Sequence, residues 1–449
     1  MVDSNTVDVV IIGAGISGIN AGYRVQTGLP NSSYVILESR HEIGGTWSLF
    51  KYPGIRSDSD LHVSAMDWKS DRQQWQITVN GDSEKPQIYY ANWVLKGTGY
   101  YDYREPLEAD IPGIKSFEGT VIHPQFWPEN YDYTDKRVIV IGSGATAVTL
   151  LPSMAPSAKL VTMLQRSPSY FFAPPEIERA NLAIKRWFPA WWAHRIMRWR
   201  MLILSYVFYY ICRLCPSLMR KALIKGVERQ LPPGQKTDPN FTPRYNPWQQ
   251  RMCITPGGDF FEAIRSGKAD VVTDTIDTVT PTGIKLSSGR ELPADVIVTA
   301  TGLKVNLDAH ATLTVDGTPV RYGQKFVWKG ALVQDVPNFA FIFGYTNASW
   351  TLGADATAQL FVRLVKATAE RGATSVTPHL DDSIAHTVKS VPTLNLNSTY
   401  IAKAIERGDL PKVGHSGPWI PRSNYFRDYW NSRWGDLSNG LQFNRVAVE

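Results

Sequence analysis

The sequence V-D-V-V-I-I at residues 7–12 runs directly into G-A-G-I-S-G at residues 13–18. A short apolar run of this kind is typical of a buried parallel strand. In a strand–loop–helix unit, Gly13 permits a tight turn, Gly15 lets the backbone approach a pyrophosphate, and Gly18 lets the helix pack closely on the strand. The stretch therefore predicts a Rossmann-like unit that binds a dinucleotide.

The next predicted strand specifies which dinucleotide fits this loop. It runs from Tyr34 to Leu37 and ends at Glu38, 20 residues after Gly18. An acidic side chain at this place accepts hydrogen bonds from a ribose and would repel a 2′-phosphate. The first site is therefore predicted to bind FAD or NAD rather than NADP.

A second loop repeats the pattern. Residues 136–141, K-R-V-I-V-I, precede Gly142-Ser143-Gly144-Ala145-Thr146-Ala147. The strand after it, residues 160–164, ends in Gln165-Arg166-Ser167 with no acid. Arg166 offers the planar guanidinium that suits a 2′-phosphate, although an arginine here could also be a solvated surface residue. This second loop is predicted to bind NADPH.

Two small-residue turns mark where the chain crosses between modules. One is Gly97-Thr98-Gly99, and the other closes the apolar strand from Asp295 to Gly302. Because 449 residues are too many for one core, we predict an α/β fold with two Rossmann-like dinucleotide-binding domains, for FAD and NADP, the second inserted in the first. The expected limits are 1–100 and 300–449 for the FAD-binding domain, 101–135 for a linker, and 136–299 for the NADP-binding domain, with a helical insertion at about 175–235.

Two predicted elements near the C-terminus complete the first domain. Residues 338–343 are predicted to form another buried strand and residues 352–366 a helix. The start of that helix could present backbone N–H groups to the electron-rich end of a flavin, or it could serve core packing.

Residues 179–230 have a helical pattern rich in aromatic and basic side chains: Trp187, Trp191, Trp192, Arg195, Arg198, Trp199 and Arg200. The apolar run from Met201 to Cys212 is twelve residues long, and a spanning helix needs about 20. We interpret the segment as a helical excursion that roofs the active site. An interfacial helix, with peripheral membrane association, is the alternative.

Composition indicates an ordinary globular protein, with 43% hydrophobic and 20% charged residues. The net charge of +6 fits a positive site for a phosphorylated cofactor better than a nucleic-acid surface. Only three cysteines occur, which indicates a reducing compartment. Cys212 and Cys215 are interpreted as helix residues rather than a redox pair. The polar N-terminus predicts no signal peptide, so we expect a cytoplasmic protein. We also expect no metal site.

Between the two loops lies F-E-G-T-V-I-H-P-Q-F-W-P at residues 117–128. It resembles the fingerprint of Baeyer-Villiger monooxygenases, which are class B flavoprotein monooxygenases. The matching positions are Phe117, Gly119, His123, Trp127 and Pro128. The related N- and S-oxygenating flavin monooxygenases usually carry Tyr or Phe where this chain has Trp127. Three further segments resemble the ethionamide-activating group of the family: residues 44–47 (G-G-T-W), 52–60 (Y-P-G-I-R-S-D-S-D) and 245–251 (Y-N-P-W-Q-Q-R).

This resemblance implies a reaction with small-molecule substrates and O₂. NADPH reduces FAD, the reduced flavin captures O₂ as a C4a-peroxide, and the peroxide oxygenates ketones, aldehydes, thioethers or thiocarbonyls. Arg251 matches the family's active-site arginine, and Asp58 the acid that positions it. A permanently charged guanidinium physically suits the stabilisation of a peroxyanion. His123 is implied to couple domain motions to cofactor chemistry, rather than to act as an acid or base.

The implied cofactor-binding residues come from both loops and their neighbours: Gly13, Gly15, Gly18, Glu38, Thr46, Trp47, Asp58, Gly142, Ser143, Gly144, Thr146, Ala147, Arg166 and Gln250. Many relatives carry Lys where this chain has Gln250, which leaves Arg166 as the main 2′-phosphate partner. After Asp58 the family continues with several dozen residues, whereas this chain passes almost directly from Val63 to Trp68 and the strand at residues 74–79.

Three alternative functions follow from these features. An N- or S-oxygenating flavin monooxygenase shares the architecture and differs at Trp127. A catalytically impaired flavin- or nucleotide-binding protein would follow if the shortening damages the FAD site. A dithiol reductase needs a redox cysteine pair near the first loop, and the sequence has none there.

Overall fold

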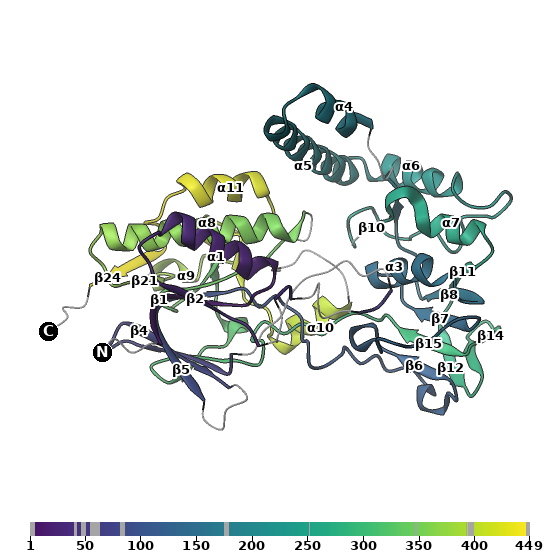
Figure 1. Ribbon diagram of the computed structural model, residues 1–449, viewed down its shortest axis with the longest axis horizontal. Helices are drawn as coiled ribbons and strands as arrows, with labels where there is room; N and C mark the ends of the chain where they lie inside the picture. The colour runs from purple at the N-terminus through teal and green to yellow at the C-terminus, as the bar shows by residue number, and fades with distance from the viewer. Residues whose placement is uncertain are drawn as a thin grey trace. The chain divides into compact units, whose positions relative to one another are not determined.

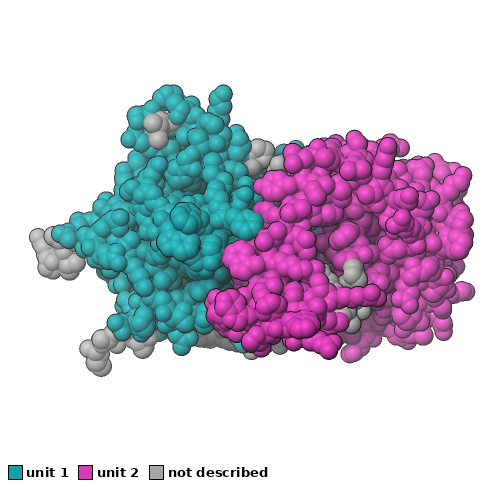
Figure 2. Space-filling model, turned by 90° about the horizontal axis from the view of Figure 1, so that it is seen from above, with its two compact units in different colours: residues 1–49, 56–105, 303–449 teal, residues 50–55, 106–302 magenta. Residues whose placement is uncertain are grey.

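The computed structural model describes residues 5–39, 43–45, 51–53, 63–80, 86–174, 179–250, 252–345, 348–391, 393 and 399–445. The chain divides into two compact units (Figure 2). The first comprises residues 1–49, 56–105 and 303–449, and the second comprises residues 50–55 and 106–302. The second unit is thus inserted in the first, as the predicted fold class requires. The narrower domain limits expected from the sequence stay a prediction.

The first unit contains a sheet of ten strands. The strands are β1 (Thr6–Ile12), β2 (Tyr34–Leu37), β3 (Ala65–Lys69), β4 (Gln74–Val79), β5 (Gln87–Lys96), β16 (Thr312–Val315), β17 (Thr318–Pro319), β18 (Val327–Trp328), β19 (Leu332–Val333) and β20 (Phe339–Phe341). β5 is central: β1 runs parallel to it from Tyr90 to Lys96, β4 pairs antiparallel with its first half, and β20 pairs parallel with its end. Two separate pairs are β21 (Ser375–Pro378) with β24 (Leu441–Asn444), and β22 (Ser390–Val391) with β23 (Val413–Gly414).

Helix α8 packs against both α1 and α11 beside this sheet (Figure 1). The helices of the first unit are α1 (Ile16–Gly28), α8 (Trp350–Glu370), α9 (Asp382–Ala385), α10 (Thr399–Arg407) and α11 (Tyr425–Trp434), with short 3₁₀ turns η4 (Tyr322–Gln324) and η5 (Gly417–Trp419). Val9 and Ile11 of β1 pack into the cluster that contains α1 and α8, whereas Val10 and Ile12 pack into a second cluster. A strand buried on both faces needs a continuous apolar run, which explains V-V-I-I.

The second unit is built on a five-stranded parallel sheet in the order β11-β8-β7-β15-β6. Its strands are β6 (Thr120–Ile122), β7 (Arg137–Ile141), β8 (Leu160–Gln165), β11 (Ala269–Thr273) and β15 (Val296–Thr299), with smaller sheets formed by β9 (Phe171–Phe172) and β10 (Cys253–Ile254), and by β12 (Ile276–Thr280), β13 (Gly283–Leu286) and β14 (Glu291–Pro293). Its helices are α3 (Ala145–Met154), α4 (Arg179–Trp187), α5 (Ala190–Leu214), α6 (Pro216–Glu228) and α7 (Asp259–Arg265), with η1 (Ile114–Ser116), η2 (Pro124–Phe126) and η3 (Pro256–Gly258).

Most predicted elements are confirmed within this framework. Strands β1, β2, β7, β8 and β20, helix α8, and the helical segment after residue 179 all lie where the sequence patterns place them. Cys212 lies in α5 and Cys215 follows it, and both thiols are free. Burial raises the pKa of the Cys212 thiol to about 11, which suits a packed helix residue rather than a reactive thiol.

Candidate functional site

The first glycine loop joins β1 to α1 in a tight turn. Gly13 has a φ of 116°, and its N–H donates to the carbonyl of Leu37 at 2.9 Å. A Cβ atom on Gly18 would lie 1.5 Å from the carbonyl oxygen of Gly13. Only glycine therefore allows α1 to begin this close to the strand. Gly15 is the N-terminal capping residue of α1, and no side chain caps the helix there.

Glu38 directly follows β2 and lies beside this loop. Its Oε2 atom accepts a hydrogen bond from the backbone N–H of Ala14 at 2.9 Å, and its Oε1 atom accepts one from Ser39 at 3.1 Å. A carboxylate can accept several hydrogen bonds at once, so Glu38 can bind the backbone of the loop and also suits contact with a ribose. The start of α8 also lies here, because the Trp350 indole donates to the Ser17 hydroxyl at 3.2 Å. Trp350 further stacks on Tyr100, with ring centroids 4.8 Å apart.

The second glycine loop joins β7 to α3. Gly142 has a φ of 138°, and its N–H donates to Leu164 at 2.8 Å. A Cβ atom on Gly142 would lie 2.3 Å from the carbonyl oxygen of Ala300. Ala147 is fully buried at the place that corresponds to Gly18 in the first loop. The turn therefore leads directly into a closely packed helix.

Gly144 is the N-terminal capping residue of α3, and no side chain caps this helix either. Among the described residues, no heavy atom lies within 4 Å of an ideal Cβ on Gly144. The first backbone N–H groups of a helix bind anions when no side chain occupies them. Both loops therefore fit the diphosphate of a dinucleotide, and the second has open space at the glycine that the diphosphate would approach. By this test each loop fits a dinucleotide, and the assignment of FAD to the first loop and NADPH to the second stays a prediction.

Three residues that the sequence analysis did not assign support the second loop. The Tyr52 hydroxyl hydrogen-bonds to Thr146, and burial raises the pKa of this tyrosine. The Ser143 carbonyl accepts a hydrogen bond from the Ser169 hydroxyl at 3.2 Å and one from the Cys253 thiol at 3.5 Å. Burial raises the pKa of Cys253 to about 12, so the thiol is inert. The segment that begins Tyr52-Pro53 was singled out by its resemblance to the family, but nothing in the sequence links Ser169 or Cys253 to the loop.

Arg166 and Gln250, the two predicted 2′-phosphate partners, are also described. Arg166 is exposed directly after β8, two residues beyond the Leu164 carbonyl that binds Gly142. It therefore lies at the carboxyl edge of the parallel sheet, where ligands of open α/β sheets bind. Gln250 is half-buried in the segment before β10. Thr46, Trp47, Asp58 and Arg251 lie outside the described residues.

The fingerprint segment packs along the edge strand β6. Phe117 and Trp127 are buried. A Cβ atom on Gly119 would lie 2.6 Å from the Phe117 ring and 2.5 Å from the Asp295 carbonyl oxygen, so this position needs glycine. Pro128 is exposed, and its carbonyl accepts a hydrogen bond from Tyr131 at 3.2 Å.

His123 occupies the turn between β6 and η2. Its Nδ1 atom accepts a hydrogen bond from the Gln125 N–H at 3.3 Å. Burial lowers the pKa of His123, and a hydrogen bond to the backbone of Gly302 partly offsets this effect. Gly302 is the last residue of the second unit before the chain returns to the first. Burial thus favours the neutral form of the fingerprint histidine, which lies near the point where the chain returns to the first unit.

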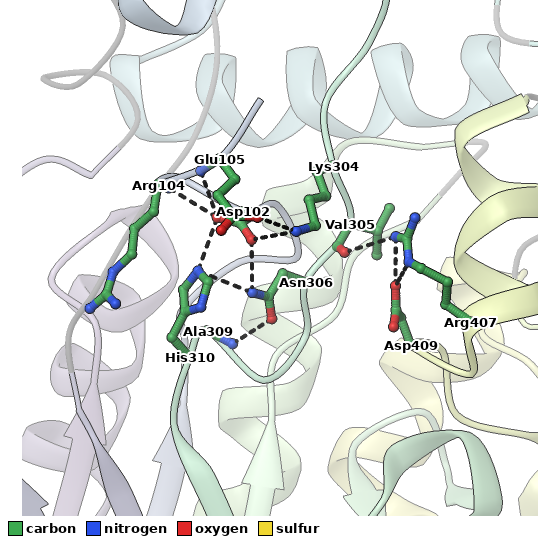
Figure 3. Close-up of polar contacts among 10 residues, drawn as sticks. All are labelled: Asp102, Arg104, Glu105, Lys304, Val305, Asn306, Ala309, His310, Arg407 and Asp409. Atoms are coloured by element: carbon green, nitrogen blue, oxygen red, sulfur yellow. Dashed lines mark hydrogen bonds and ion pairs between the residues drawn. The ribbon is translucent and has the colours of Figure 1, made fainter. Parts of the chain in front are cut away.

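In the first unit, a polar cluster connects the segment before the chain enters the second unit with the segment after it returns (Figure 3). The buried carboxylate of Asp102 accepts hydrogen bonds from the backbone N–H groups of Arg104 and Glu105, both at 3.0 Å. It also bonds to Asn306 at 3.1 Å and to the His310 ring at 3.0 Å. Lys304 forms ion pairs with Asp102 and Glu105. Residues 102–105 and 304–310 are thus tied together where the chain leaves and re-enters the first unit.

These features together define a class of protein, a chain with two dinucleotide sites in which one Rossmann-like domain is inserted in another. The profile of the flavin-binding monooxygenase-like family matches residues 49–174, and that of the NAD(P)-binding Rossmann-like domain matches residues 11–76. The chain is 42% identical to the FAD-containing monooxygenase EthA of Mycolicibacterium smegmatis, with 94% of this chain and 93% of the relative covered. It is 39% identical to EthA of Mycobacterium tuberculosis, with 97% of each covered.

The chain therefore belongs to the family of FAD-containing monooxygenases. It is an NADPH-dependent flavoprotein monooxygenase, with FAD and NADPH as its cofactors. Solved structures show the same fold at lower identity. A cyclohexanone monooxygenase with bound epsilon-caprolactone is 19% identical with a TM-score of 0.70 over 98% of this chain and 100% of that one. A steroid monooxygenase bound to NADP is 16% identical with a TM-score of 0.71 over 98% and 100%.

This chain is shorter than its relative within the aligned region. The alignment with the M. smegmatis relative spans 466 positions, whereas 94% of the 449 residues is about 422 residues. The difference, about 44 alignment positions, therefore has no residue in this chain. The resemblance to the family predicts that the missing stretch follows Val63, and this location stays a prediction.

Proposed function

We propose that this monooxygenase inserts one oxygen atom into ketones or aldehydes, or oxidises the sulfur of thioethers and thiocarbonyls. For a ketone, the balanced reaction converts ketone, O₂, NADPH and a proton into an ester, NADP⁺ and water. The observation that carries the proposal is the fingerprint segment, in which Trp127 is buried and follows the edge strand β6 by five residues. Trp127 favours carbonyl oxygenation over the N- and S-oxygenating relatives, which usually carry Tyr or Phe there.

Residues of the first loop would bind FAD, and residues of the second loop would bind NADPH. When bound, FAD accepts a hydride from NADPH and supplies the electrons that activate O₂. Glu38 would bind the FAD ribose and the start of α1 its diphosphate. The start of α3 would bind the diphosphate of NADPH, and Arg166 its 2′-phosphate.

Arg251 would stabilise negative charge on the oxygen that is transferred, because a guanidinium stays protonated at every working pH. Asp58 would hold this guanidinium in place. Support comes from the neighbours of Arg251 in the chain. Cys253 lies two residues further on, and its thiol contacts the carbonyl of Ser143 in the second loop. The segment that carries Arg251 thus runs to the NADPH loop.

Replacing Arg251 by Ala tests this role. We expect Arg251→Ala to retain FAD and its reduction by NADPH but to lose product formation by a factor of about 100 or more. The NADPH consumed should instead appear as hydrogen peroxide. Ester from a cyclic ketone and sulfoxide from an aryl methyl thioether are measured beside NADPH and peroxide. Arg244→Ala, at an exposed position in the same segment, is the control. Unchanged product from Arg251→Ala would refute the mechanism.

The shorter chain favours a second candidate function, an NADPH oxidase that converts O₂, NADPH and a proton into NADP⁺ and hydrogen peroxide. About 44 alignment positions present in the relative are absent here, and a less enclosed flavin releases peroxide to water more readily. The ratio of oxygenated product to NADPH consumed by the unaltered protein decides between them. A ratio near one supports the oxygenase, and a ratio near zero with every ketone and thioether supports the oxidase.

A further inference from the structure

The positive charge of this protein is concentrated in one helical segment. Residues 179–227 contain seven arginines, three lysines and no aspartate or glutamate. The rest of the chain has 37 basic against 41 acidic residues, so without this segment the protein would be slightly acidic. The segment comprises α4, α5 and nearly all of α6, and we call it the basic segment. Figure 1 shows α4 and α5 side by side as a helical hairpin.

Helix α5 also carries a continuous exposed apolar stripe. Its members are Trp192, Trp199, Ile203, Val207, Tyr210 and Leu214, and between 39% and 78% of each residue is exposed. At 100° per residue these positions fall within an arc of about 80° on the helix surface. Trp187, Phe188 and Trp191, where α4 ends and α5 begins, are exposed as well. A contiguous apolar surface of this kind marks an interaction site rather than ordinary surface.

The buried residues of α5 are not members of the stripe. Its buried residues are Ala193, Leu202, Tyr206 and Cys212. Cys212 packs in a small cluster with Tyr170, Leu223 and Met252, which anchors the helix to the second unit. α4 has no buried residue among those described. Burial of these residues accounts for the anchoring of α5, whereas the large exposed fraction of the stripe residues requires another explanation.

The charges that flank the stripe identify the partner. Arg195 and Arg213 lie within about 40° of it on the helix surface, Arg198 lies further round, and the Arg195 guanidinium lies 3.8 Å from the centre of the Trp191 ring. Tryptophan and arginine together are typical of helices that lie in the headgroup region of a membrane. Anionic headgroups attract basic segments. A second copy of this chain fits less well, because pairing two basic segments would bring like charges together.

No single described helix is long and apolar enough to cross a bilayer, while α5 and α6 together pass that test but meet at an angle of 116°. We propose that the basic segment binds the surface of an anionic phospholipid membrane, with the stripe of α5 inserted among the headgroups and the arginines on the lipid phosphates. The stripe supplies apolar burial and the arginines supply the preference for anionic lipid.

Sedimentation of the full-length flavoprotein with lipid vesicles tests this proposal. We expect it to bind vesicles of mixed phosphatidylcholine and phosphatidylglycerol, to bind phosphatidylcholine alone much less, and to dissociate as salt is raised. The variant Trp192→Ser/Trp199→Ser/Leu214→Ser should lose at least about tenfold in partitioning. Trp430→Ser/Trp434→Ser is the matched control, because these tryptophans of α11 are 61% and 58% exposed. FAD content and thermal unfolding verify that each variant is folded.

A charge variant separates the two contributions. Arg195→Gln/Arg198→Gln/Arg213→Gln keeps the stripe and should remove the preference for phosphatidylglycerol. The proposal fails if the unaltered protein stays in the supernatant with anionic vesicles at low salt, or if the stripe variant binds as well as the control. It also fails if the stripe variant changes the oligomeric state in light scattering while vesicle binding is unchanged, since the stripe would then be covered by a second copy.

Discussion

Gly18 and Ala147 occupy the same place in the two glycine loops but meet different surroundings. A methyl group on Gly18 would collide with the Gly13 carbonyl at 1.5 Å, whereas the second loop already buries the methyl group of Ala147. Helix α1 therefore starts closer to its strand than α3 does. Helix packing thus determines which residue fits at Gly18 and Ala147, the third defined place of each loop pattern. The space needed for a diphosphate determines the residue at the second place, Gly15 or Gly144.

The glycines of the two loops should respond differently to alanine. We expect Gly18→Ala to lower the free energy of unfolding by about 1–3 kcal/mol and to reduce FAD content, because the backbone must move. Gly144→Ala should leave stability within about 0.5 kcal/mol but weaken NADP⁺ binding at least about tenfold, since the methyl group would occupy the open space. Urea unfolding and calorimetric titration measure these effects. Gly226→Ala, also in open space, is the control. Equal behaviour of the first two variants would contradict this assignment.

Arg166 is the residue predicted to select NADPH over NADH. Removing a charged hydrogen-bond partner of a phosphate costs about 1.5–3 kcal/mol. We therefore expect Arg166→Ala to raise KM for NADPH by about 10- to 100-fold while KM for NADH stays the same. Steady-state kinetics with both coenzymes measure this, and Arg290→Ala, at an exposed hairpin of the same unit, serves as control. An equal loss for both coenzymes would mean that Arg166 acts elsewhere.

At the scale of elements, sequence patterns predicted those strands and turns that depend on residues close together in the chain. The strands β1 and β7, both glycine turns and Glu38 follow from residues that are neighbours in the chain. Tyr52 lies in a segment that the sequence singled out, but the contacts of Ser169 and Cys253 with the second loop could not be predicted, because these residues reach it from separate segments without a shared motif. The ten-stranded sheet likewise depends on long-range pairing, such as β16 with β3. Arg251 and Asp58 were assigned by resemblance and stay predictions.

The Asp102 cluster stabilises the connection between the two crossing segments, and it should make stability depend on pH. Burial alone would raise the pKa of Asp102, but hydrogen bonds from His310, Asn306 and the backbone of Glu105 and Arg104 outweigh it and lower the pKa. A carboxyl whose pKa is lower in the folded state stabilises the fold above its unfolded pKa, about 4. This contribution is lost as pH falls through the folded value.

We therefore expect Asp102→Asn to lower the free energy of unfolding by about 3 kcal/mol at pH 7, because the partners of a buried carboxylate lose their charge complement. The difference from the unaltered protein should stay constant down to about pH 5 and shrink below pH 4. Urea unfolding across this pH range measures it. Asp71→Asn, whose side chain is 75% exposed, should have little effect at any pH. A deficit that persists undiminished below pH 4 would show that packing, not charge, is responsible.

At the scale of the whole molecule, each unit has its own sheet and its own hydrophobic clusters. The proposed FAD loop lies in the first unit and the proposed NADPH loop in the second. A ligand stabilises the unit that it binds by RT ln(1 + [L]/Kd), about 2.7 kcal/mol at a hundredfold excess over Kd. Each cofactor should therefore act on the unfolding of one unit more than on the other.

Scanning calorimetry should accordingly resolve two transitions, because separate cores need not unfold together. Added FAD should raise the midpoint of one and NADP⁺ that of the other, by about 5–10 °C for a unit of some 200 residues. Asp102→Asn identifies the transition of the first unit by lowering its midpoint, and Arg166→Ala should abolish only the shift caused by NADP⁺. If one transition responds to both ligands, and Asp102→Asn lowers that same midpoint, the two units unfold as one cooperative structure and the cofactor sites are coupled through its stability.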